Sequence, residues 1–386
     1  MKKTHLFAPG PTPIPPEALL TMAHPILHHR TPEYEALIAE VREGLKVLFQ
    51  TTEEVFLFAA SGTGGMEAAV VNTLSPGEKA LVIRGGKFGE RWGEICQAYG
   101  VNFTPIDVPY GKVVDPRLVA AALEKDPQIA VVLSTYSETS TGVLHDIKAI
   151  AEAVRKTPTL LVVDAITSLG VMDVPMDDWG LDVVVAGSQK ALMLPPGLAM
   201  VGVSRKAWAA VERSRLPKYY FDFAAEQKHL LKNQSRFTPA ISLVVGLRET
   251  LRMIQSEGLP NIFRRHEKLA AAMRAGITGL GLELFAERPS PAVTAVLVPK
   301  GIDGGAILNT LRTRHGVIIA GGQGSMKGKI FRLATMGYAD SSDVVVALSA
   351  LELTLAEVGY PVKLGDGIRA AQEVLASMSN VQSPMS

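Results

Sequence analysis

Residues 160–196 read LLVVDAITSLGVMDVPMDDWGLDVVVAGSQKALMLPP, and this stretch limits the folds that the chain can adopt. It contains two uninterrupted apolar runs, 160–163 and 183–186, which are typical of strands buried on both faces of a parallel sheet. The first run ends at Asp164, and the second leads through Gln189 to Lys190. Because ligands of open α/β sheets bind beyond the carboxyl ends of the strands, we predict that Asp164 and Lys190 face one small-molecule site.

A glycine-rich turn follows a third strand pattern at residues 54–60. The turn is SGTGG, from Ser61 to Gly65, and a helix-like segment follows it. Free N–H groups and the positive end of the helix dipole converge at such a turn, so Ser61, Gly62 and Thr63 are candidates for binding a phosphate. The turn lacks the GxxxxGK[ST] lysine and the GxGxxG spacing, which argues against a nucleoside-triphosphate loop and a dinucleotide fingerprint.

An anion site, a strand-end carboxylate and a strand-end lysine together meet the needs of pyridoxal 5′-phosphate. The phosphate needs the anion site, the pyridine nitrogen needs an anion that keeps it protonated, and the aldehyde needs an amine. Taken singly, Asp164 or Lys190 could equally be a solvated loop charge or half of a salt bridge. The combination with the SGTGG turn favours the cofactor site.

Composition bounds the class of protein. The chain has 386 residues, 47% of them hydrophobic and 20% charged, with a net charge of +1, so neither a nucleic-acid surface nor a membrane surface is indicated. No apolar run has the length of a membrane span or a signal peptide, and we expect a cytoplasmic protein. The single cysteine, Cys96, excludes an internal disulfide, and its helix-like surroundings do not suit the nucleophile of a cysteine desulfurase. We expect no metal site.

Strand-like and helix-like segments alternate up to about residue 255, which predicts an α/β domain with a doubly wound, mostly parallel sheet. The remaining chain has strand patterns at 293–298, 317–320 and 330–334 and helix patterns at 305–313 and 342–357, which suit a smaller α+β domain. We predict an N-terminal arm over the active site at residues 1–20, a large domain at 21–258 and a small domain at 259–386.

The sequence resembles the class V aminotransferases of fold type I, and within them the alanine/serine–glyoxylate aminotransferase group. The motifs that carry the resemblance extend from Ala8 to Gly337: APGPTPIPP, SGTGG, FGERW, SETSTGVLHDI, VVDAITSLG and GSQKALMLPPG. The resemblance implies pyridoxal 5′-phosphate as cofactor and a homodimer with shared active sites. It also implies transfer of an amino group from a small amino acid, alanine or serine, to a 2-oxo acid, with glyoxylate expected.

The resemblance assigns roles around the cofactor ring. Lys190 would bind the aldehyde and move a proton between the substrate α-carbon and C4′, while Asp164 keeps the pyridine nitrogen charged. Phe88 would stack on the ring, although a phenylalanine at a helix start ordinarily belongs to the core. Thr139 and Gln189 would reach the ring oxygen. Ile166 would face the same side as Asp164 if that strand continues, and could pack beneath the ring.

Four further residues are assigned to the partner subunit's phosphate or to the substrate. Gln234 and Thr238 lie in a polar segment, 221–239, that we expect to be irregular and to contact the phosphate bound by the partner; the tyrosine that the family often has near Gln234 is missing. Gly10 lies in the proline-rich arm and would be near the substrate. Arg332, in a strand pattern, could reach the surface, but its guanidinium suits the substrate α-carboxylate.

Two other functions are compatible with these motifs. A transaminase for 2-aminoethylphosphonate or ureidoglycine shares many of them. A non-catalytic, hydrogenase-associated protein of the same fold is a more distant alternative, against which the presence of both Asp164 and Lys190 argues.

Overall fold

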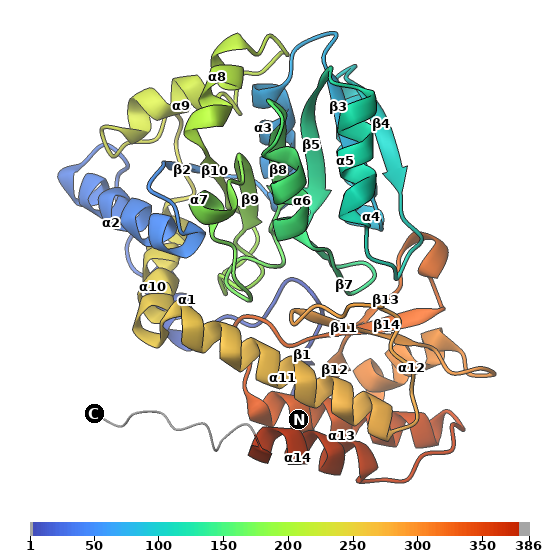
Figure 1. Ribbon diagram of the computed structural model, residues 1–386. Coiled ribbons are helices and arrows are strands. Elements are labelled where there is room, and N and C mark those ends of the chain that lie inside the picture. Colours follow the sequence, from blue (N-terminus) through green and yellow to red (C-terminus); the bar gives the residue numbers. More distant parts are fainter. Residues whose placement is uncertain (1–2, 378–386) are drawn as a thin grey trace.

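A computed structural model, described here for residues 3–377, has two lobes with the N-terminal arm between them (Figure 1). The upper lobe is built on a seven-stranded sheet of order β2-β10-β9-β8-β5-β3-β4. Its strands are β2 (Val55–Phe58), β10 (Ala199–Val203), β9 (Val183–Gly187), β8 (Leu160–Asp164), β5 (Ile129–Thr135), β3 (Lys79–Arg84) and β4 (Asn102–Asp107).

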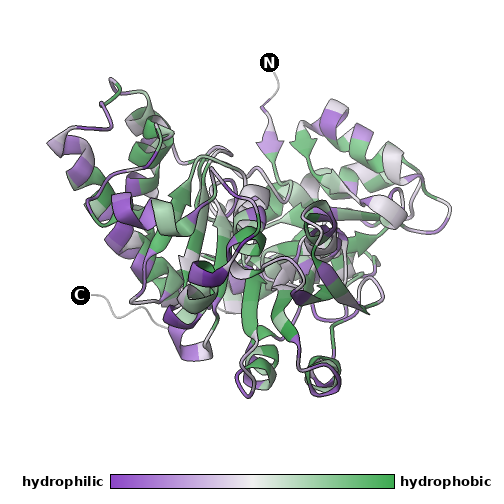
Figure 2. Ribbon diagram, turned by 90° about the horizontal axis from the view of Figure 1, so that it is seen from above, coloured by the Kyte–Doolittle hydropathy of each residue, from purple (hydrophilic) through white to green (hydrophobic). Residues whose placement is uncertain are grey.

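The sheet is mostly parallel, and only β10 runs antiparallel to its neighbours β2 and β9. Every residue of the central strands β8, β9 and β10 is buried, because helices cover both faces of the sheet. Seen from above, hydrophobic residues follow the strands inside, and hydrophilic residues gather on the outer faces of the helices (Figure 2). The predicted α/β fold with a mostly parallel sheet is confirmed.

Helices α3 (Gly62–Thr73) and α4 (Lys87–Ala98) pack on one face of the sheet, and α5 (Pro116–Lys125), α6 (Ile147–Val154) and α7 (Met176–Trp179) lie on the other (Figure 1). Four more helices complete this lobe: α1 (Pro16–Met22), α2 (Pro32–Phe49), α8 (Arg205–Arg213) and α9 (Phe223–Leu230). The carboxyl ends of β2, β3, β5, β8 and β9 point to the same edge, which faces the lower lobe (Figure 1). The turns that follow these strands therefore meet there.

The lower lobe has a three-stranded antiparallel sheet, β11 (Val293–Leu297), β14 (Ile330–Ala334) and β13 (Ala320–Gly321). Helices α10 (Ile241–Glu257) and α11 (Leu259–Gly279) run from the upper lobe into the lower one, with Gly258 between them (Figure 1). The other elements are α12 (Gly304–Thr310), the π-helix η1 (Leu311–His315), the 3₁₀-helix η2 (Gly324–Met326), α13 (Ser341–Glu357) and α14 (Asp366–Ser377).

Two separate clusters of buried apolar side chains underlie the two lobes. The larger one surrounds the seven-stranded sheet, and the smaller one joins α11, α13, α14 and the three-stranded sheet. Phe7 of the arm belongs to the smaller cluster. The larger cluster still includes Ile262 of α11, and we propose the three-part division given above with its boundary at Gly258, between α10 and α11.

The N-terminal arm is attached to both lobes. Its short strand β1 (His5–Leu6) pairs in parallel with β12 (Val317–Ile318) of the lower lobe. Farther along, the Thr12 N–H donates to the carbonyl of Gln189 (3.2 Å), and the Thr12 hydroxyl donates to the carbonyl of Lys190 (2.8 Å). The arm thus reaches the turn that carries the predicted catalytic lysine.

Several elements differ from the sequence prediction. The segment 221–239 was expected to be irregular throughout, which is wrong: it contains α9, whose N-cap Asp222 accepts a hydrogen bond from the Ala225 N–H at 3.0 Å. The predicted strand at 317–320 is two short strands, β12 and β13, and the helix predicted to reach Thr313 ends its α-helical part at Thr310.

Within residues 3–377, no helix combines the length and apolar character that a membrane crossing requires. The same residues hold no group of three or more His, Cys, Asp or Glu side chains arranged to bind a metal ion.

Candidate active site

Lys190 lies in the turn after β9, and its side chain is 9% exposed. Its ammonium group donates to the carbonyl oxygen of Pro9 in the arm. Gly10 has a φ of +133°, which favours glycine, and a Cβ atom there would meet the Lys190 Nζ where the arm crosses the lysine. Burial lowers the pKa of Lys190 to about 8; Asp164 opposes this shift, and Arg332 and Arg91 add to it. A larger share of this lysine is therefore a neutral amine at neutral pH than for a solvated lysine.

Asp164 is the last residue of β8, between Thr135 of β5 and Val185 of β9 in the register of the sheet. One carboxylate oxygen, Oδ1, accepts the Ile166 N–H at 2.9 Å. Burial raises the pKa of Asp164 to about 7, against the Ile166 hydrogen bond and the nearby positive charges of Arg91 and Lys190; the Glu138 carboxylate raises this pKa further. A cation placed beside Asp164, such as a protonated ring nitrogen, would stabilise its ionised form.

Ile166 is not part of the strand, because β8 ends at Asp164 and a turn follows. Ile166 was expected to face the same side as Asp164 only if the strand continued beyond Asp164, and the strand does not continue. The turn instead packs the Ile166 side chain against Gly62 and Gly187, where a Cβ atom on Gly62 would collide with it. It lies between the start of α3 and the end of β9, at the strand-end edge of the sheet.

The glycine-rich turn forms the start of α3. Its N-cap Ser61 makes no side-chain capping hydrogen bond, and the first N–H groups of a helix have no intrahelical acceptor. The hydroxyl of Thr63 accepts a hydrogen bond from Arg91 Nη1 at 3.0 Å. The Arg91 guanidinium also lies over the ring of Phe88, 4.8 Å from its centre. A cation thus connects the proposed phosphate site to the proposed stacking ring.

Two polar side chains, Thr139 and Gln189, lie near the proposed cofactor site. Thr139 follows β6 (Ser137–Glu138), and its hydroxyl is 2.6 Å from that of Thr167, in the turn after Asp164. Gln189 precedes Lys190, and its buried Oε1 has no hydrogen-bond partner among residues 3–377. A buried amide oxygen without a partner is costly, which is consistent with a site that a ligand completes.

Arg332 brings a charge from the lower lobe into the same space. It is 4% exposed in the middle of β14, and it does not snorkel to the surface. Its Nη1 donates to the carbonyl of Thr139 (2.8 Å), and its Nε and Nη2 donate to the carbonyl of Gly321 (3.0 and 2.7 Å). Burial lowers the pKa of Arg332 to about 10, while Glu138 opposes this shift. A guanidinium has five N–H donors, so these three bonds leave one N–H on each terminal nitrogen.

Gln234 and Thr238 are not among the residues that surround Lys190 within one chain. Gln234 accepts a hydrogen bond from Arg30 (3.2 Å) and donates one to Glu35 (2.7 Å) at the start of α2. The adjacent Ser235 hydroxyl is 3.3 Å from the hydroxyl of Tyr34. This segment is therefore anchored to α2, and its proposed contact with a phosphate requires a second subunit.

Four residues at the site were not singled out from the sequence: Pro9, Arg91, Glu138 and Thr167. Arg91 and Glu138 lie within two of the quoted motifs, FGERW and SETSTG, and Thr167 follows Asp164 by three residues. Their place inside these motifs was the available signal for Arg91 and Glu138. Pro9 contributes only its carbonyl oxygen, for which the sequence carries no signal.

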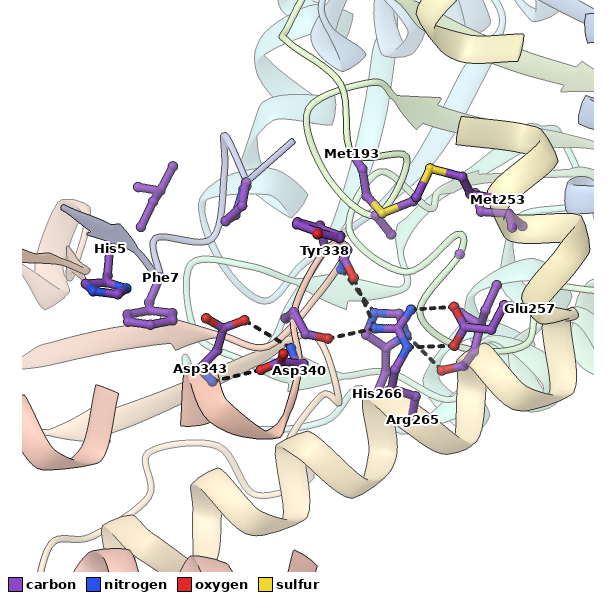
Figure 3. Close-up of a pocket in the computed structure, with 18 of the residues that line it drawn as sticks. His5, Phe7, Met193, Met253, Glu257, Arg265, His266, Tyr338, Asp340 and Asp343 are labelled. Atoms are coloured by element: carbon purple, nitrogen blue, oxygen red, sulfur yellow. Dashed lines mark hydrogen bonds and ion pairs between the residues drawn. The ribbon is translucent and has the colours of Figure 1, made fainter. Parts of the chain in front are cut away.

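A cavity of about 560 Å³ lies behind the lysine turn and includes Met193 but neither Lys190 nor Asp164 (Figure 3). On its wall, Arg265 pairs with Glu257 (2.6 Å) and donates to the carbonyls of Gly337 and Ala339. His266 accepts the Gly337 N–H at 3.0 Å, and burial lowers the pKa of His266 to about 3. These contacts hold the loop after β14 against α11. The chemistry lies at the strand-end edge and not in this cavity.

Cys96 is fully buried in α4, and burial raises the pKa of its thiol to about 12. It stays protonated near neutral pH, so it cannot serve as a thiolate nucleophile.

The arrangement fits pyridoxal 5′-phosphate. The uncapped start of α3 can hold the phosphate, Asp164 the ring nitrogen and Lys190 the aldehyde. The buried Gln189 Oε1, without a partner among residues 3–377, is a feature of this chain that a bound cofactor accounts for.

Comparison with known proteins agrees with this chemistry. The pattern of the family "Aminotransferase class-V" matches residues 5–344. Among curated relatives, the chain is 44% identical to "Soluble hydrogenase, small subunit" of Synechococcus sp. (strain PCC 6716), covering 97% of this chain and 99% of the relative. It is 40% identical to L-aspartate–glyoxylate aminotransferase of Paracoccus denitrificans (95% and 95%) and 38% identical to serine–glyoxylate aminotransferase of Hyphomicrobium methylovorum (96% and 94%).

A solved aminotransferase structure also resembles this chain in three dimensions. Ureidoglycine–glyoxylate aminotransferase from Bacillus subtilis superposes with a TM-score of 0.92 at 30% identity, over 97% of this chain and 99% of that one. The likeness extends over both lobes, including the elements that carry Lys190, Asp164 and Arg332. The chain therefore belongs to the class V aminotransferase family and is a pyridoxal 5′-phosphate-dependent aminotransferase of fold type I.

Proposed function

We propose that this enzyme transfers the amino group of a small amino acid, serine or alanine, to glyoxylate. The three aminotransferases compared above all have glyoxylate in their names and differ in the other substrate. The acceptor is therefore the common element of the comparison, and the choice of donor depends on the site.

The single observation that carries the proposal is the state of Arg332. It is buried, its hydrogen bonds go only to backbone carbonyls, and one N–H remains on each terminal nitrogen. A carboxylate can accept both N–H groups as a bidentate pair. Amino acids and 2-oxo acids both carry that carboxylate next to the reacting carbon, so one arginine can serve both halves of the reaction.

The arm favours a small substrate. The Pro9 carbonyl contacts the Lys190 amine, and Gly10 lies so close to that amine that a Cβ atom would collide with it. The substrate's reacting carbon must approach this same amine. Limited space beside Gly10 suits glyoxylate, serine and alanine better than a long side chain.

The residues would then divide the work as follows. The cofactor supplies the electron sink that makes the substrate Cα–H acidic. Lys190, as a neutral amine, would accept that proton and deliver it to C4′ of the cofactor. Asp164 holds the ring nitrogen in its protonated form, Phe88 covers the ring, and Thr139 and Gln189 face its oxygen. Ser61, Gly62 and Thr63 hold the phosphate.

We also propose a homodimer in which Gln234 and Thr238 of each chain complete the phosphate site of the other. The support is the contact of Gln234 with Glu35 of α2, away from Lys190 of the same chain, together with exposed aromatic and aliphatic side chains nearby. Tyr219 is 74% exposed and Leu231 is 62% exposed. A cytoplasmic location, proposed from the single cysteine, completes this description.

A panel of amino donors with glyoxylate and pyruvate as acceptors tests the substrate. We expect L-serine or L-alanine with glyoxylate to give the highest kcat/KM. The panel includes L-aspartate and ureidoglycine because relatives carry those names, and 2-aminoethylphosphonate because it lacks a carboxylate. A preference for 2-aminoethylphosphonate would contradict the role given to Arg332, and a preference for L-aspartate would contradict the small pocket.

A hydrogenase-associated role remains the more distant alternative, since two relatives at 44% identity carry hydrogenase names. The buried Asp164 and Lys190, with pKa values shifted toward each other, are not needed by a scaffold. An aminotransferase activity above background in the panel would support the enzymatic assignment over a scaffold.

A further inference from the structure

Glu138 is a completely buried carboxylate next to the active site, and none of the roles above uses it. It is the last residue of β6, and four hydrogen-bond donors surround it. The N–H groups of Phe88 (3.2 Å) and Gly89 (2.9 Å) come from the start of α4. The N–H (3.1 Å) and hydroxyl (2.5 Å) of Ser140 come from the segment after β6.

Three of the four contacts come from backbone N–H groups, which can only donate, so they favour an ionised carboxylate. The Ser140 hydroxyl accepts the Lys87 N–H at 3.0 Å and donates to the ionised Glu138. The carboxylate also lies at the N-terminus of α4, where the helix dipole favours a negative charge. Burial opposes ionisation and raises the pKa of Glu138.

The two segments that Glu138 joins carry side chains proposed to contact the cofactor. The start of α4 carries Phe88, and the segment after β6 carries Thr139. The peptide of Thr139 also accepts the Nη1 hydrogen bond of Arg332. There is no spare room at the junction, because a Cβ atom on Gly86 would collide with the Glu138 carboxyl group and the Ser140 hydroxyl.

We propose that Glu138 is a positioning residue, whose carboxylate fixes Phe88 on one side of the cofactor ring and Thr139 on another. It acts only through the backbone of these segments and touches neither the ring nor the substrate. Loss of the charge leaves the N–H groups of Phe88 and Gly89 without an acceptor in a buried place, so α4 must shift or admit water. Either change moves Phe88 relative to Thr139.

The ordinary alternative is that Glu138 only caps a helix and adds stability. A buried glutamate in the small domain provides a matched control for this alternative. Glu352 of α13 is 3% exposed and accepts the N–H groups of Gly365 (2.7 Å), Gly367 (2.9 Å) and Ile368 (3.1 Å) at the start of α14. It has the same chemistry as Glu138 but no contact with the active site.

The test compares Glu138→Gln with Glu352→Gln in the full-length protein. The cofactor is first removed, and the dissociation constant for pyridoxal 5′-phosphate is measured by equilibrium dialysis. Hydrogen exchange of the cofactor-free protein reports on the amides of Phe88 and Gly89, and thermal unfolding reports on global stability. None of these measurements depends on which amino acid the enzyme uses, so the outcome is independent of the proposed substrate.

We expect both variants to unfold at a lower temperature, but only Glu138→Gln to bind the cofactor more weakly, by about tenfold or more. Faster exchange at Phe88 and Gly89 should accompany that loss, while Glu352→Gln speeds exchange only at the start of α14. An unchanged dissociation constant in Glu138→Gln would overturn the proposal. So would an equal loss of affinity in Glu352→Gln, because affinity would then follow global stability.

If Glu138→Gln does not fold, Ser140→Ala tests the proposal instead. It removes one donor and keeps the Glu138 charge, so we expect a smaller loss of affinity, about threefold, with faster exchange at Lys87. A cofactor affinity equal to that of the unaltered protein would count against Glu138 as a positioning residue. Glu138→Asp, which keeps the charge on a shorter side chain, should bind the cofactor better than Glu138→Gln.

Discussion

Replacing Arg332 tests the central claim about substrate binding. In Arg332→Ala the guanidinium is lost, and the carbonyls of Thr139 and Gly321 lose their donors. The cofactor should still bind, because the proposed phosphate and ring contacts come from the upper lobe. Binding and reaction of the substrate carboxylate should both be impaired.

The expected size follows from the donors that remain on Arg332. Two N–H groups, one on each terminal nitrogen, are left for the substrate, and a hydrogen bond to a charged group contributes about 1.5–3 kcal/mol. Since paired bonds are not additive, we expect a total loss of about 3 kcal/mol, which lowers kcat/KM roughly a hundredfold. Arg332→Lys should recover only part of this, because an ammonium cannot form the planar fork.

Single-turnover kinetics provide the assay. The cofactor-loaded enzyme is mixed with L-alanine and, in parallel, with a primary amine that lacks a carboxylate, and the change in cofactor absorbance is followed. Arg332→Ala should slow the reaction of L-alanine and leave the slow reaction of the simple amine nearly unchanged. Equal impairment toward both would refute the assignment and would indicate a general distortion of the site.

Three further predictions concern other parts of the chain. Borohydride treatment of the loaded enzyme should attach the cofactor covalently to the peptide containing Lys190; a label found on another lysine would contradict the proposed mechanism. Heterodimers of a Lys190→Ala chain with a Gln234→Ala/Thr238→Ala chain should regain activity, since each contains one site with all groups intact; heterodimers that form but stay inactive would argue against shared sites. Burial lowers the pKa of His145 to about 4 and that of His266 to about 3, so both are neutral in the folded protein and take up protons in the unfolded chain below their ordinary value of 6.5. The free energy of unfolding should therefore be highest above that value and fall as the pH falls toward these folded values, by up to about 1.4 kcal/mol per pH unit for each histidine. Urea unfolding between about pH 7 and about pH 5 should show a smaller fall in a His266→Gln variant; an identical fall would mean that His266 is not responsible.

The central part of the fold was predictable because its signals are local. An apolar run ending in Asp164 and another leading to Lys190 identify two buried strands and the edge where they end. The edge strand β4 was not predicted, and its surroundings give the reason. It contains Pro105, and none of its residues is fully buried, so it lacks the apolar run of an interior strand.

The site was predictable only where chemistry and position coincide in the sequence. Lys190 and Asp164 each stand at the end of a buried strand, and Arg332 stands inside one. Glu138 and Arg91 differ, because they act through partners far along the chain: Glu138 binds an N–H group 49 residues away, and Arg91 binds a hydroxyl 28 residues away. Such pairings arise from the order of strands in the sheet, where β3 and β5 are neighbours, and periodicity along the sequence does not report them.

The double attachment of the N-terminal arm means that the two lobes are mechanically coupled at the catalytic lysine. Near one end, Phe7 packs in the small-domain core, and its carbonyl accepts the Ala334 N–H at 2.7 Å, two residues from Arg332. Near the other end, Thr12 is bonded to the backbone of Gln189 and Lys190. Only four residues, 8–11, lie between these anchors, so a rotation of the small domain on binding a carboxylate at Arg332 would pull the Pro9 carbonyl relative to the Lys190 amine. The arm would then act as a short tether that reports occupation of the carboxylate site to the lysine.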